Sequence, residues 1–537
     1  MARTWICALA GGLFLGVTYQ WGRQLDTAGN VNFTAPATWI GTLGIAVVAT
    51  PLLAWGFTAL QKRLTDGTKK EKENGDGSFS RRGWLFLALG LFLFWIPVFL
   101  AVYPGFFAYD ATDELQEVLS GSYVTRHPLL HVLILGKTVA GVERLTDSYN
   151  FGIAAYVLIQ MAAMALLLSW VLESLKELGA GKLLRRFGFV FFSLFPVIPM
   201  YVLCTSKDIW YTAGMLALLV LLCKMEKDKA GFDGKAGKWI GMGAALFVMA
   251  IFRNNGFYVF LVMIPALLVL AGKKCWKKMA VTIALVLAVY FGTNGVLDAA
   301  LKPVSTDVQE TLTVPIQQLA RTWKYSPELF SQEDREALFE ILPEEVLARY
   351  NPKLSDLVKI DFGTQAYQEN PGRYRSLWLK TGLKAPFTYL NAWLMTSYGF
   401  WYPFTVIDVY NGSRYYTESS YFSCETEPPG WRHSFFEPLE KVYEEISWGS
   451  RVHRIPVLSW LFSPGFLCWI YVLAGLFFAA SGQWRKLFVL APVYLNWMTV
   501  LLGPTYLVRY VLIFWFALPA LLFLGCHQNT NVLYFKR

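Results

Sequence analysis

The chain has few cysteines and histidines, and their spacing excludes the common structural uses of both. Seven cysteines and five histidines occur in 537 residues, without a CxxC pair or a His–Cys cluster. A disulfide framework or a structural zinc site needs such clustering, so neither is expected. We expect most of the thiols to pack within the membrane, and only Cys204 and Cys424 to lie near or beyond its outer face. An internal repeat is also lacking, which weakens the case for a transporter built from inverted repeats.

Charge is scarce as well. Charged residues make up 16% of the chain and hydrophobic residues 55%, and several apolar runs reach the roughly 20 residues that cross a bilayer. A soluble protein of this composition would need an implausibly large core. The formal net charge of +10 does not indicate nucleic-acid binding, because Lys and Arg collect in short loops between the apolar runs. The composition therefore predicts an all-α, multi-pass protein of the cell membrane.

Apolar run lengths predict about twelve membrane-spanning helices. Their approximate bounds are 4–20, 37–60, 84–103, 151–173, 187–204, 209–223, 239–252, 257–272, 279–297, 460–480, 487–502 and 508–525. The basic loops 61–83, 174–186, 224–238 and 273–278 (KKCWKK) are predicted to be cytoplasmic, because Lys and Arg favour that side. Both termini are then cytoplasmic as well.

The same pattern divides the chain into five parts. They are an N-terminal transmembrane hairpin (1–60), a polar cytoplasmic linker (61–83), a transmembrane core (84–297) with a first external loop (104–150), an external segment (298–459) and C-terminal transmembrane helices (460–537). In the external segment, Ser331 and Asp334 predict a helix start before an amphipathic run, so we expect a small helical domain with juxtamembrane helices. Tyr and Trp are frequent in 385–403, which predicts an interfacial helix on the outer leaflet rather than a further crossing.

The first external loop holds the most informative motif, YPGFFAYDATDELQEV…RHPLLH at 103–131, directly after an apolar span. Carboxylates just beyond the outer end of a membrane helix suit chemistry at the membrane surface. The charged and titratable residues of the motif are Asp110, Asp113, Glu114, Glu117, Arg126, His127 and His131.

A structural role explains part of this motif equally well. Asp110, Asp113, Glu114 and Glu117 have the spacing of one helix face. Asp110 is suited to an N-cap, Asp113 to the positive end of the helix dipole, and the others to a solvated face. For Asp110 a cap and a catalytic role are compatible; for the other three the solvated face is the stronger interpretation.

Three further turns on the predicted outer side carry cations, namely Lys207, Arg253 and Arg509. The span 239–252 before Arg253 has fourteen residues, which reach about 21 Å of a roughly 30 Å hydrocarbon core. We therefore expect these cations to lie below the outer surface, lining an outward cavity together with Asp110. Each arginine alone is more typical of a snorkelling anchor.

Three recessed cations and a carboxylate suit an anionic amphiphile as substrate. Lys and Arg hold a phosphate head group, while the lipid tail stays between helices. A carboxylate beside the phosphate can deprotonate an acceptor hydroxyl for attack on a sugar anomeric carbon. The cations then stabilise the departing phosphate.

At these residues the chain resembles the GT-C glycosyltransferases, the multi-pass superfamily of the protein O-mannosyltransferases and the lipid A aminoarabinose transferase. It is most similar to a poorly characterised bacterial family of that group. The resemblance covers roughly 84–300, and 460–525 more weakly. It rests on the long first core span, Asp110, His127-Pro128-Leu129, Lys207-Asp208, Arg253-Asn254-Asn255-Gly256 and Arg509-Tyr510.

The resemblance implies a GT-C-like core and inverting transfer from a polyprenyl-phosphate sugar, without a metal or other cofactor. Asp110 would act as the base, and Asp208 would make a second acidic contribution. The mannosyltransferases have two adjacent acidic residues and a doubled proline after His, whereas here Asp110 stands alone before a single Pro128. The acceptor is therefore left open as a glycan, a lipid or a protein. The expected substrate-binding residues are Asp113, Glu114, Arg126, His127, Lys207, Arg253, Asn255, Arg509 and Tyr510.

Two other functions use similar features. A transporter or flippase of a lipid-linked glycan would use the same cations and cavity, but Asp110 would be dispensable and both membrane faces would have access. A membrane O-acyltransferase needs a histidine recessed among helices. The first four histidines, His127, His131, His433 and His453, fall in predicted external segments, so this function is the weakest of the three.

Overall fold

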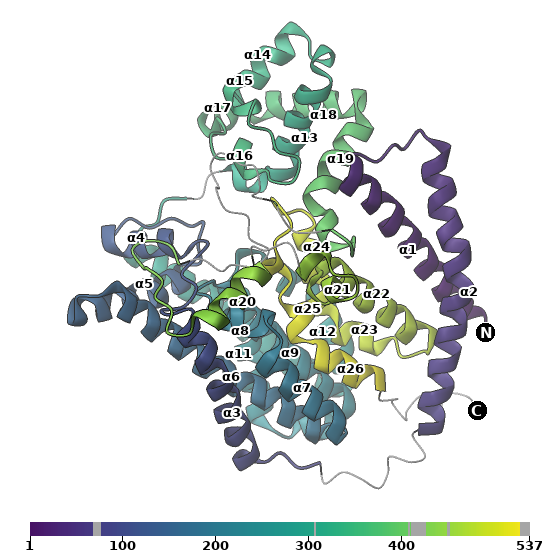
Figure 1. The fold of residues 1–537 in the computed structure, drawn as a ribbon, viewed down its shortest axis with the longest axis vertical. Coiled ribbons are helices and arrows are strands. Elements are labelled where there is room, and N and C mark those ends of the chain that lie inside the picture. Colours follow the sequence, from purple (N-terminus) through teal and green to yellow (C-terminus); the bar gives the residue numbers. More distant parts are fainter. Residues whose placement is uncertain (68–76, 306–307, 406–408, 410–425, 448–451, 527–537) are drawn as a thin grey trace.

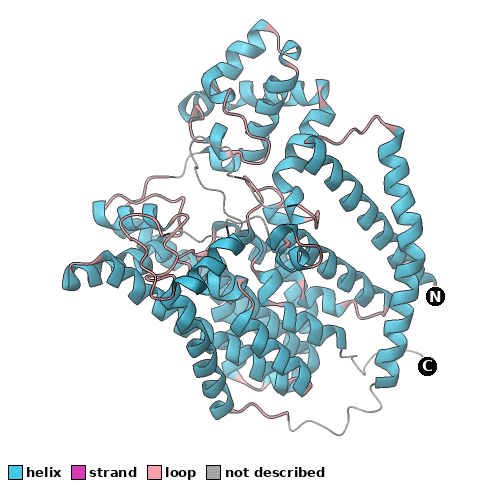
Figure 2. Ribbon diagram, in the orientation of Figure 1, coloured by secondary structure: helices cyan, strands magenta, loops and turns pink. Residues whose placement is uncertain are grey.

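The computed structural model describes residues 1–67, 77–305, 308–405, 409, 426–447 and 452–526. Within these ranges the chain is helical, and extended pairing is limited to three isolated bridges. The all-α prediction is thus confirmed for the described part (Figure 2). Cys424 lies outside the described residues.

Five helices are long and apolar enough to cross a membrane. They are α2 (Pro36–Gly67), α3 (Arg81–Ala101), α6 (Tyr149–Glu177), α9 (Asp208–Lys227) and α12 (Asn254–Leu301). Two apolar helices are shorter, α11 (Ala236–Ile251) and α22 (Pro464–Ala480). These lengths and compositions indicate a helical membrane protein.

Three of the predicted spans are broken rather than continuous. Span 187–204 divides into α7 (Lys182–Leu194) and α8 (Val197–Val202). Spans 487–502 and 508–525 divide likewise. Proline explains the breaks, because its ring removes a backbone donor and clashes with the preceding turn. Pro196, Pro492 and Pro519 stand at or next to the starts of the new helices, where proline is tolerated. The pieces of the other two spans are α23 (Arg485–Val489), α24 (Ala491–Val500), α25 (Ile513–Phe516) and α26 (Leu518–Cys526).

Spans 257–272 and 279–297 form the two halves of α12. The chain turns sharply at Gly272, with φ 60° and ψ −173°, and the Phe257 and Tyr290 rings of the two halves stack at 4.4 Å. A backbone conformation with this φ favours glycine, which allows the change of direction within one residue. The predicted turn between the two spans therefore lies at Gly272, directly before KKCWKK, and the KKCWKK residues are themselves helical.

The N-terminal hairpin is held by close backbone contact between α1 (Ala2–Ala28) and α2, at the right of Figure 1. A Cβ on Gly16 would lie 2.3 Å from the Thr42 carbonyl oxygen, and one on Gly12 would lie 2.7 Å from that of Ala46. Glycines four residues apart thus form a smooth strip on which the second helix rests, as in many membrane helix pairs.

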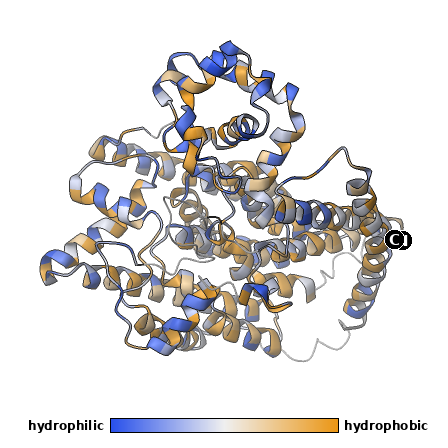
Figure 3. Ribbon diagram, turned by 45° about the horizontal axis from the view of Figure 1, so that its top comes forward, coloured by the Kyte–Doolittle hydropathy of each residue, from blue (hydrophilic) through white to orange (hydrophobic). Residues whose placement is uncertain are grey.

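Residues of 298–459 build a small helical unit with its own apolar core, at the top of Figure 1. Leu338 and Ile341 of α14 (Gln332–Ile341) lie in this core. The predicted start of α14 is confirmed, because the Ser331 hydroxyl accepts a bond from the Asp334 amide and the Asp334 carboxylate accepts from the Ser331 amide. Hydrophilic residues are frequent on this unit, while the body below it is more apolar (Figure 3).

The ambiguous segment 385–403 contains α19 (Pro386–Ser397) and a short 3-10 turn. Twelve residues of helix reach about 18 Å, which is too short to cross a bilayer core. Its position on the outer leaflet stays a prediction.

Candidate functional site

The segment between α3 and α4 is tied to the turn before α9 by backbone pairing. The Phe106 amide donates to the Leu203 carbonyl, and the Thr205 amide donates to the Phe106 carbonyl, both at 3.0 Å. Gly105 precedes this bridge with φ 121°, where a Cβ would press on Val157. The pairing brings the start of α4 (Ala111–Ser120) beside the turn that carries Lys207.

Asp110 occupies the N-cap position of α4, but its carboxylate makes no capping bond. Its Oδ2 atom lies 2.6 Å from Lys207 Nζ and 3.3 Å from Arg509 Nη1. Burial acts to raise the pKa of Asp110, but Lys207 and Arg509 outweigh it and hold that pKa well below its ordinary value. Asp110 is therefore an ionised carboxylate between two cations.

Asp208 forms the second half of this network, at the first residue of α9. Its Oδ1 lies 2.8 Å from Arg253 Nη1 in an ion pair that lacks hydrogen-bond alignment. Its Oδ2 accepts a hydrogen bond from the Ser206 hydroxyl and lies 3.8 Å from Arg509 Nη1. Arg509 thus connects Asp208 to Asp110.

Glu114 is buried at the site, with 1% of its surface exposed. This corrects the prediction that it lies on a solvated face. Its Oε1 lies 3.4 Å from Lys207 Nζ, and its Oε2 contacts Nδ1 of His131. Burial acts to raise the pKa of Glu114, but His131 and Lys207 hold it below the ordinary value.

His131 continues the buried chain of contacts behind Glu114. It lies in α5 (Leu129–Thr146), and its Nε2 is 2.9 Å from the Tyr156 hydroxyl, which accepts a bond from Trp210 Nε1. A proton on Nδ1 lets His131 donate to the Glu114 carboxylate. The expected binding residues did not include His131, although the RHPLLH motif contained it.

His127 is a further buried neighbour of Lys207. Its Nδ1 is 3.0 Å from Lys207 Nζ. Burial lowers the pKa of His127 to about 4, and the positive charge of Lys207 acts in the same direction. His127 is therefore a neutral acceptor for Lys207.

The remaining acidic residues of α4 divide between surface and interior. Asp113 and Arg126 pair at 2.6 Å with side chains 59% and 49% exposed, so Asp113 fits the solvated-face interpretation. Glu117 does not, because it is buried and its Oε2 accepts a bond from the Val124 amide. Burial raises the pKa of Glu117 to about 7.

Tyr510 contacts the arginines and Asn255 does not, and neither has a carboxylate contact in the described structure. The Tyr510 ring centroid lies 4.6 Å from the Arg253 guanidinium carbon and 5.0 Å from that of Arg509. Asn255 Nδ2 donates to the Thr499 hydroxyl, which joins the start of α12 to the end of α24. Tyr510 therefore fixes where the guanidinium groups stand, whereas Asn255 holds two helices together.

Two groups at the site were not among the expected residues. The Tyr109 ring lies 4.2 Å from the Arg509 guanidinium carbon. Glu427 accepts a bond from the Thr112 hydroxyl, and burial raises the pKa of this carboxyl. Glu427 is 315 residues from Thr112 in sequence, so no local pattern could have identified it.

The network contains three cations and three carboxylates, which form ion pairs within one cluster. The cations are Lys207, Arg253 and Arg509, and the carboxylates are Asp110, Glu114 and Asp208. In the part of the chain that the structure describes, no three His, Cys, Asp or Glu side chains are grouped to hold a metal ion. The charged donors available to an anionic ligand are thus ammonium and guanidinium groups.

A family model with the description "Family of unknown function (DUF6020)" matches residues 120–534. Lys207, Arg253 and Arg509 lie inside the match, whereas Asp110 precedes it. Comparisons with curated proteins and with solved structures find no match. Since the matched region covers more than half of the chain, the protein belongs to the DUF6020 family.

Proposed function

We propose that this protein is a GT-C type membrane glycosyltransferase that transfers a sugar from a polyprenyl-phosphate donor to an acceptor hydroxyl, with inversion. The observation that carries the proposal is the sharing of Asp110 between Lys207 and Arg509, two recessed cations from distant parts of the chain. A carboxylate beside two cations provides both elements of the reaction: a proton acceptor and a phosphate site.

Donor binding follows from competition for these cations. The donor phosphate displaces the Asp110 carboxylate from Lys207 and Arg509. Both cations keep another partner, because Lys207 lies 3.4 Å from Glu114 and Arg509 lies 3.8 Å from Asp208. They therefore stay in place while Asp110 moves. Arg253, held by Asp208 and Tyr510, adds a third contact.

Displacement also turns Asp110 into a better base. Between two cations its pKa is too low for efficient proton acceptance, since a general base works best with a pKa near the ambient pH. Phosphate neutralises the cations and raises that pKa. The acceptor oxygen then bonds to the anomeric carbon as the bond from that carbon to the phosphate oxygen breaks. The electron pair leaves with the phosphate, stabilised by Lys207 and Arg509, and the acceptor proton passes to Asp110.

The surrounding residues have positioning roles in this proposal. Glu114, held by His131, fixes the Lys207 ammonium, and neutral His127 accepts from it. Asp113 and Arg126 stand at the exposed rim, where they meet the acceptor or the sugar. We also propose the full architecture of about twelve spans, a GT-C-like core, cytoplasmic termini and an external site. The basic residues at the opposite end of α9, Lys224 and Lys227, support this orientation.

Transfer assays with purified Asp110→Asn and a panel of polyprenyl-phosphate sugars test the base. Asparagine keeps the size and N-cap suitability of Asp110 but cannot accept the proton, so turnover should fall roughly 10²–10⁴-fold. Asp361→Asn is the matched control, because Asp361 pairs with Arg349 in the small helical unit. Unchanged turnover by Asp110→Asn would remove the proposed base. A wild-type protein that moves a lipid-linked glycan across vesicles, without transfer, would establish the flippase alternative instead.

The phosphate contacts are tested separately with Arg253→Ala. Loss of a donor contact should raise the donor KM and leave kcat within a few-fold, because Arg253 is not beside Asp110. Arg485→Ala is the control, since Arg485 also pairs with a carboxylate, Glu226, at the other end of α9. A fall in kcat with an unchanged KM would contradict the role in donor binding.

A further inference from the structure

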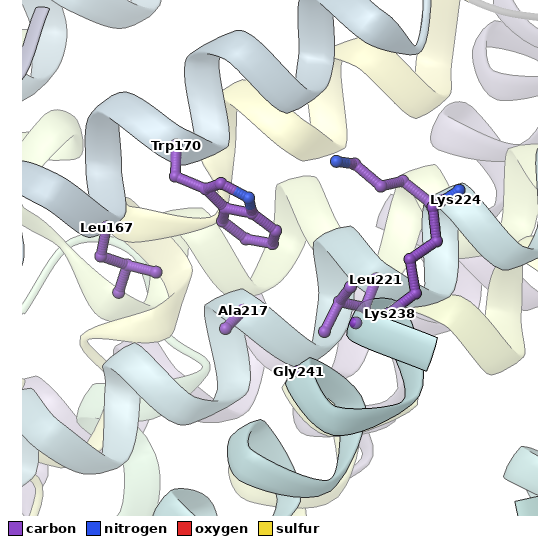
Figure 4. Close-up of a pocket in the computed structure, with 8 residues that line it drawn as sticks. Leu167, Trp170, Ala217, Leu221, Lys224, Lys238 and Gly241 are labelled. Carbon is purple, nitrogen blue, oxygen red and sulfur yellow. The ribbon is translucent and has the colours of Figure 1, made fainter. Parts of the chain in front are cut away.

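A cavity lies at the opposite end of α9 from the Asp110 site. It has a volume of about 320 Å³ and is formed between α6, α9 and α11. Its lining includes Leu167, Trp170, Leu221, Lys224, Lys238 and Gly241 (Figure 4). Lys224 follows Asp208 by sixteen residues of α9, which is about 24 Å along the helix. The cavity is therefore independent of the proposed reaction.

The apolar part of the cavity is an open groove along α11. Gly237 and Gly241 lie four residues apart, on one side of that helix. A Cβ on Gly237 would have no neighbour within 4 Å, and one on Gly241 would first meet Leu221 at 3.7 Å. Leu167 and Trp170 of α6 form the facing wall. These dimensions suit a hydrocarbon chain better than a small polar solute.

The mouth of the groove is positive. Lys224 Nζ lies 2.8 Å from Glu177 and 5.1 Å from the centroid of the Trp170 ring, which it faces in Figure 4. Lys238 stands in the same lining, and its Nζ donates to the Gly231 carbonyl at 3.4 Å. The lining thus carries two ammonium groups, one of which pairs with a carboxylate, and its net charge is positive.

We propose that this cavity binds an anionic phospholipid of the adjoining leaflet. The lipid phosphate contacts Lys238 and Lys224, and one acyl chain lies in the groove beside Gly237 and Gly241. Basic pockets between membrane helices select acidic head groups in this way. The apolar groove requires the tail as well as the phosphate, so a free phosphate ion does not satisfy the site.

Native mass spectrometry of the full-length protein, delipidated in detergent and titrated with phosphatidylglycerol or phosphatidylcholine, tests the proposal. We expect preferential retention of phosphatidylglycerol by the wild type. Gly241→Leu should abolish this preference, because the new side chain fills the groove; leucine favours a helix more than glycine does, so the fold is kept. Lys238→Gln should weaken phosphatidylglycerol binding roughly fivefold.

Two controls match these variants. Ala244→Leu adds bulk at an exposed position of α11 outside the lining, and Lys277→Gln removes an exposed lysine of α12. Both should bind like the wild type. Equal retention of the two lipids, or full phosphatidylglycerol binding by Gly241→Leu, would overturn the proposal. So would thermal stabilisation of the wild type by inorganic phosphate alone that Lys238→Gln removes, because the occupant would then be a free ion.

Discussion

Lys207 is the residue on which the polar contacts of the Asp110 site converge. Its ammonium group lies 2.6 Å from Asp110, 3.0 Å from His127 and 3.4 Å from Glu114. Burial acts to lower the pKa of Lys207, but Asp110 and Glu114 outweigh it and raise that pKa. A charged lysine was predictable from its place between two apolar spans. Its partners Glu114 and His127 were recognisable as a motif, but their burial depends on how α4 and α5 pack, which no local pattern contains.

Glu117 predicts a pH dependence of stability. Its pKa is about 7 in the folded protein and 4.5 as its ordinary value, so the folded state binds the proton more tightly. The contribution of Glu117 to the free energy of unfolding is fully present below pH 4.5 and is lost as the pH rises through 7. Glu117→Gln resembles the protonated acid and should match the wild type at low pH. At pH 8 it should be more stable by about 1–3 kcal/mol.

Thermal denaturation midpoints of both proteins in detergent, from pH 4.5 to 8, measure this effect. Glu336→Gln serves as the control, because Glu336 is exposed on α14. Parallel curves for the wild type and Glu117→Gln would show that Glu117 ionises normally in the folded protein.

At the level of elements, continuous apolar helices were predictable and interrupted ones were not. α6 and α9 follow predicted spans closely because nothing breaks their apolar runs. Hydropathy averaged over a membrane-length window passes across Pro196, Pro492 and Pro519, although each is visible in the sequence. The turn between the two halves of α12 was predicted from the charge of KKCWKK, and it lies one residue earlier, because the single residue Gly272 changes the direction of the chain.

The contact between α1 and α2 predicts a steric effect. Gly16→Leu places a side chain against the Thr42 carbonyl, and backbone cannot yield as a flexible side chain can, so the two helices must separate. We expect a loss of about 1–3 kcal/mol, measured as a lower thermal midpoint and faster proteolysis of the hairpin. Gly44→Leu on α2 is the matched control, because a Cβ there has no neighbour within 4 Å. If the two variants lost stability equally, the contact would not hold the hairpin.

The whole molecule has two chemically different ends, joined by α9. One end carries the Asp110 site and the other carries the basic residues around Lys224 and Lys235. The bias of Lys and Arg toward one set of loops made this polarity predictable from sequence. Convergence of Asp110, Lys207, Arg253 and Arg509, expected from short spans, is present in the structure. The contact of Glu427 with Thr112 could not be predicted, because the two residues are distant in sequence.

Orientation in the membrane is tested by labelling introduced cysteines with a membrane-impermeant reagent. Ser122→Cys, in the loop after α4, should react in intact cells, and Lys235→Cys, at the other end of α9, should react only after permeabilisation. Both positions are exposed. The parent protein gives the background, since Cys526 is exposed. Reaction of Lys235→Cys alone in intact cells would invert the proposed topology.

The balance of charges in the site governs how a substrate reaches it. Three positive and three negative groups cancel within a few ångströms, so little electric field extends beyond a Debye length, about 8 Å at physiological ionic strength. Long-range electrostatic steering accelerates the capture of soluble anions by open basic clefts. Because the field of this site is weak, steering should contribute little to the rate at which it captures an anion. A lipid-borne ligand needs no such steering, because diffusion in the plane of the bilayer brings it to these residues. Its rate of capture should then change little with added salt.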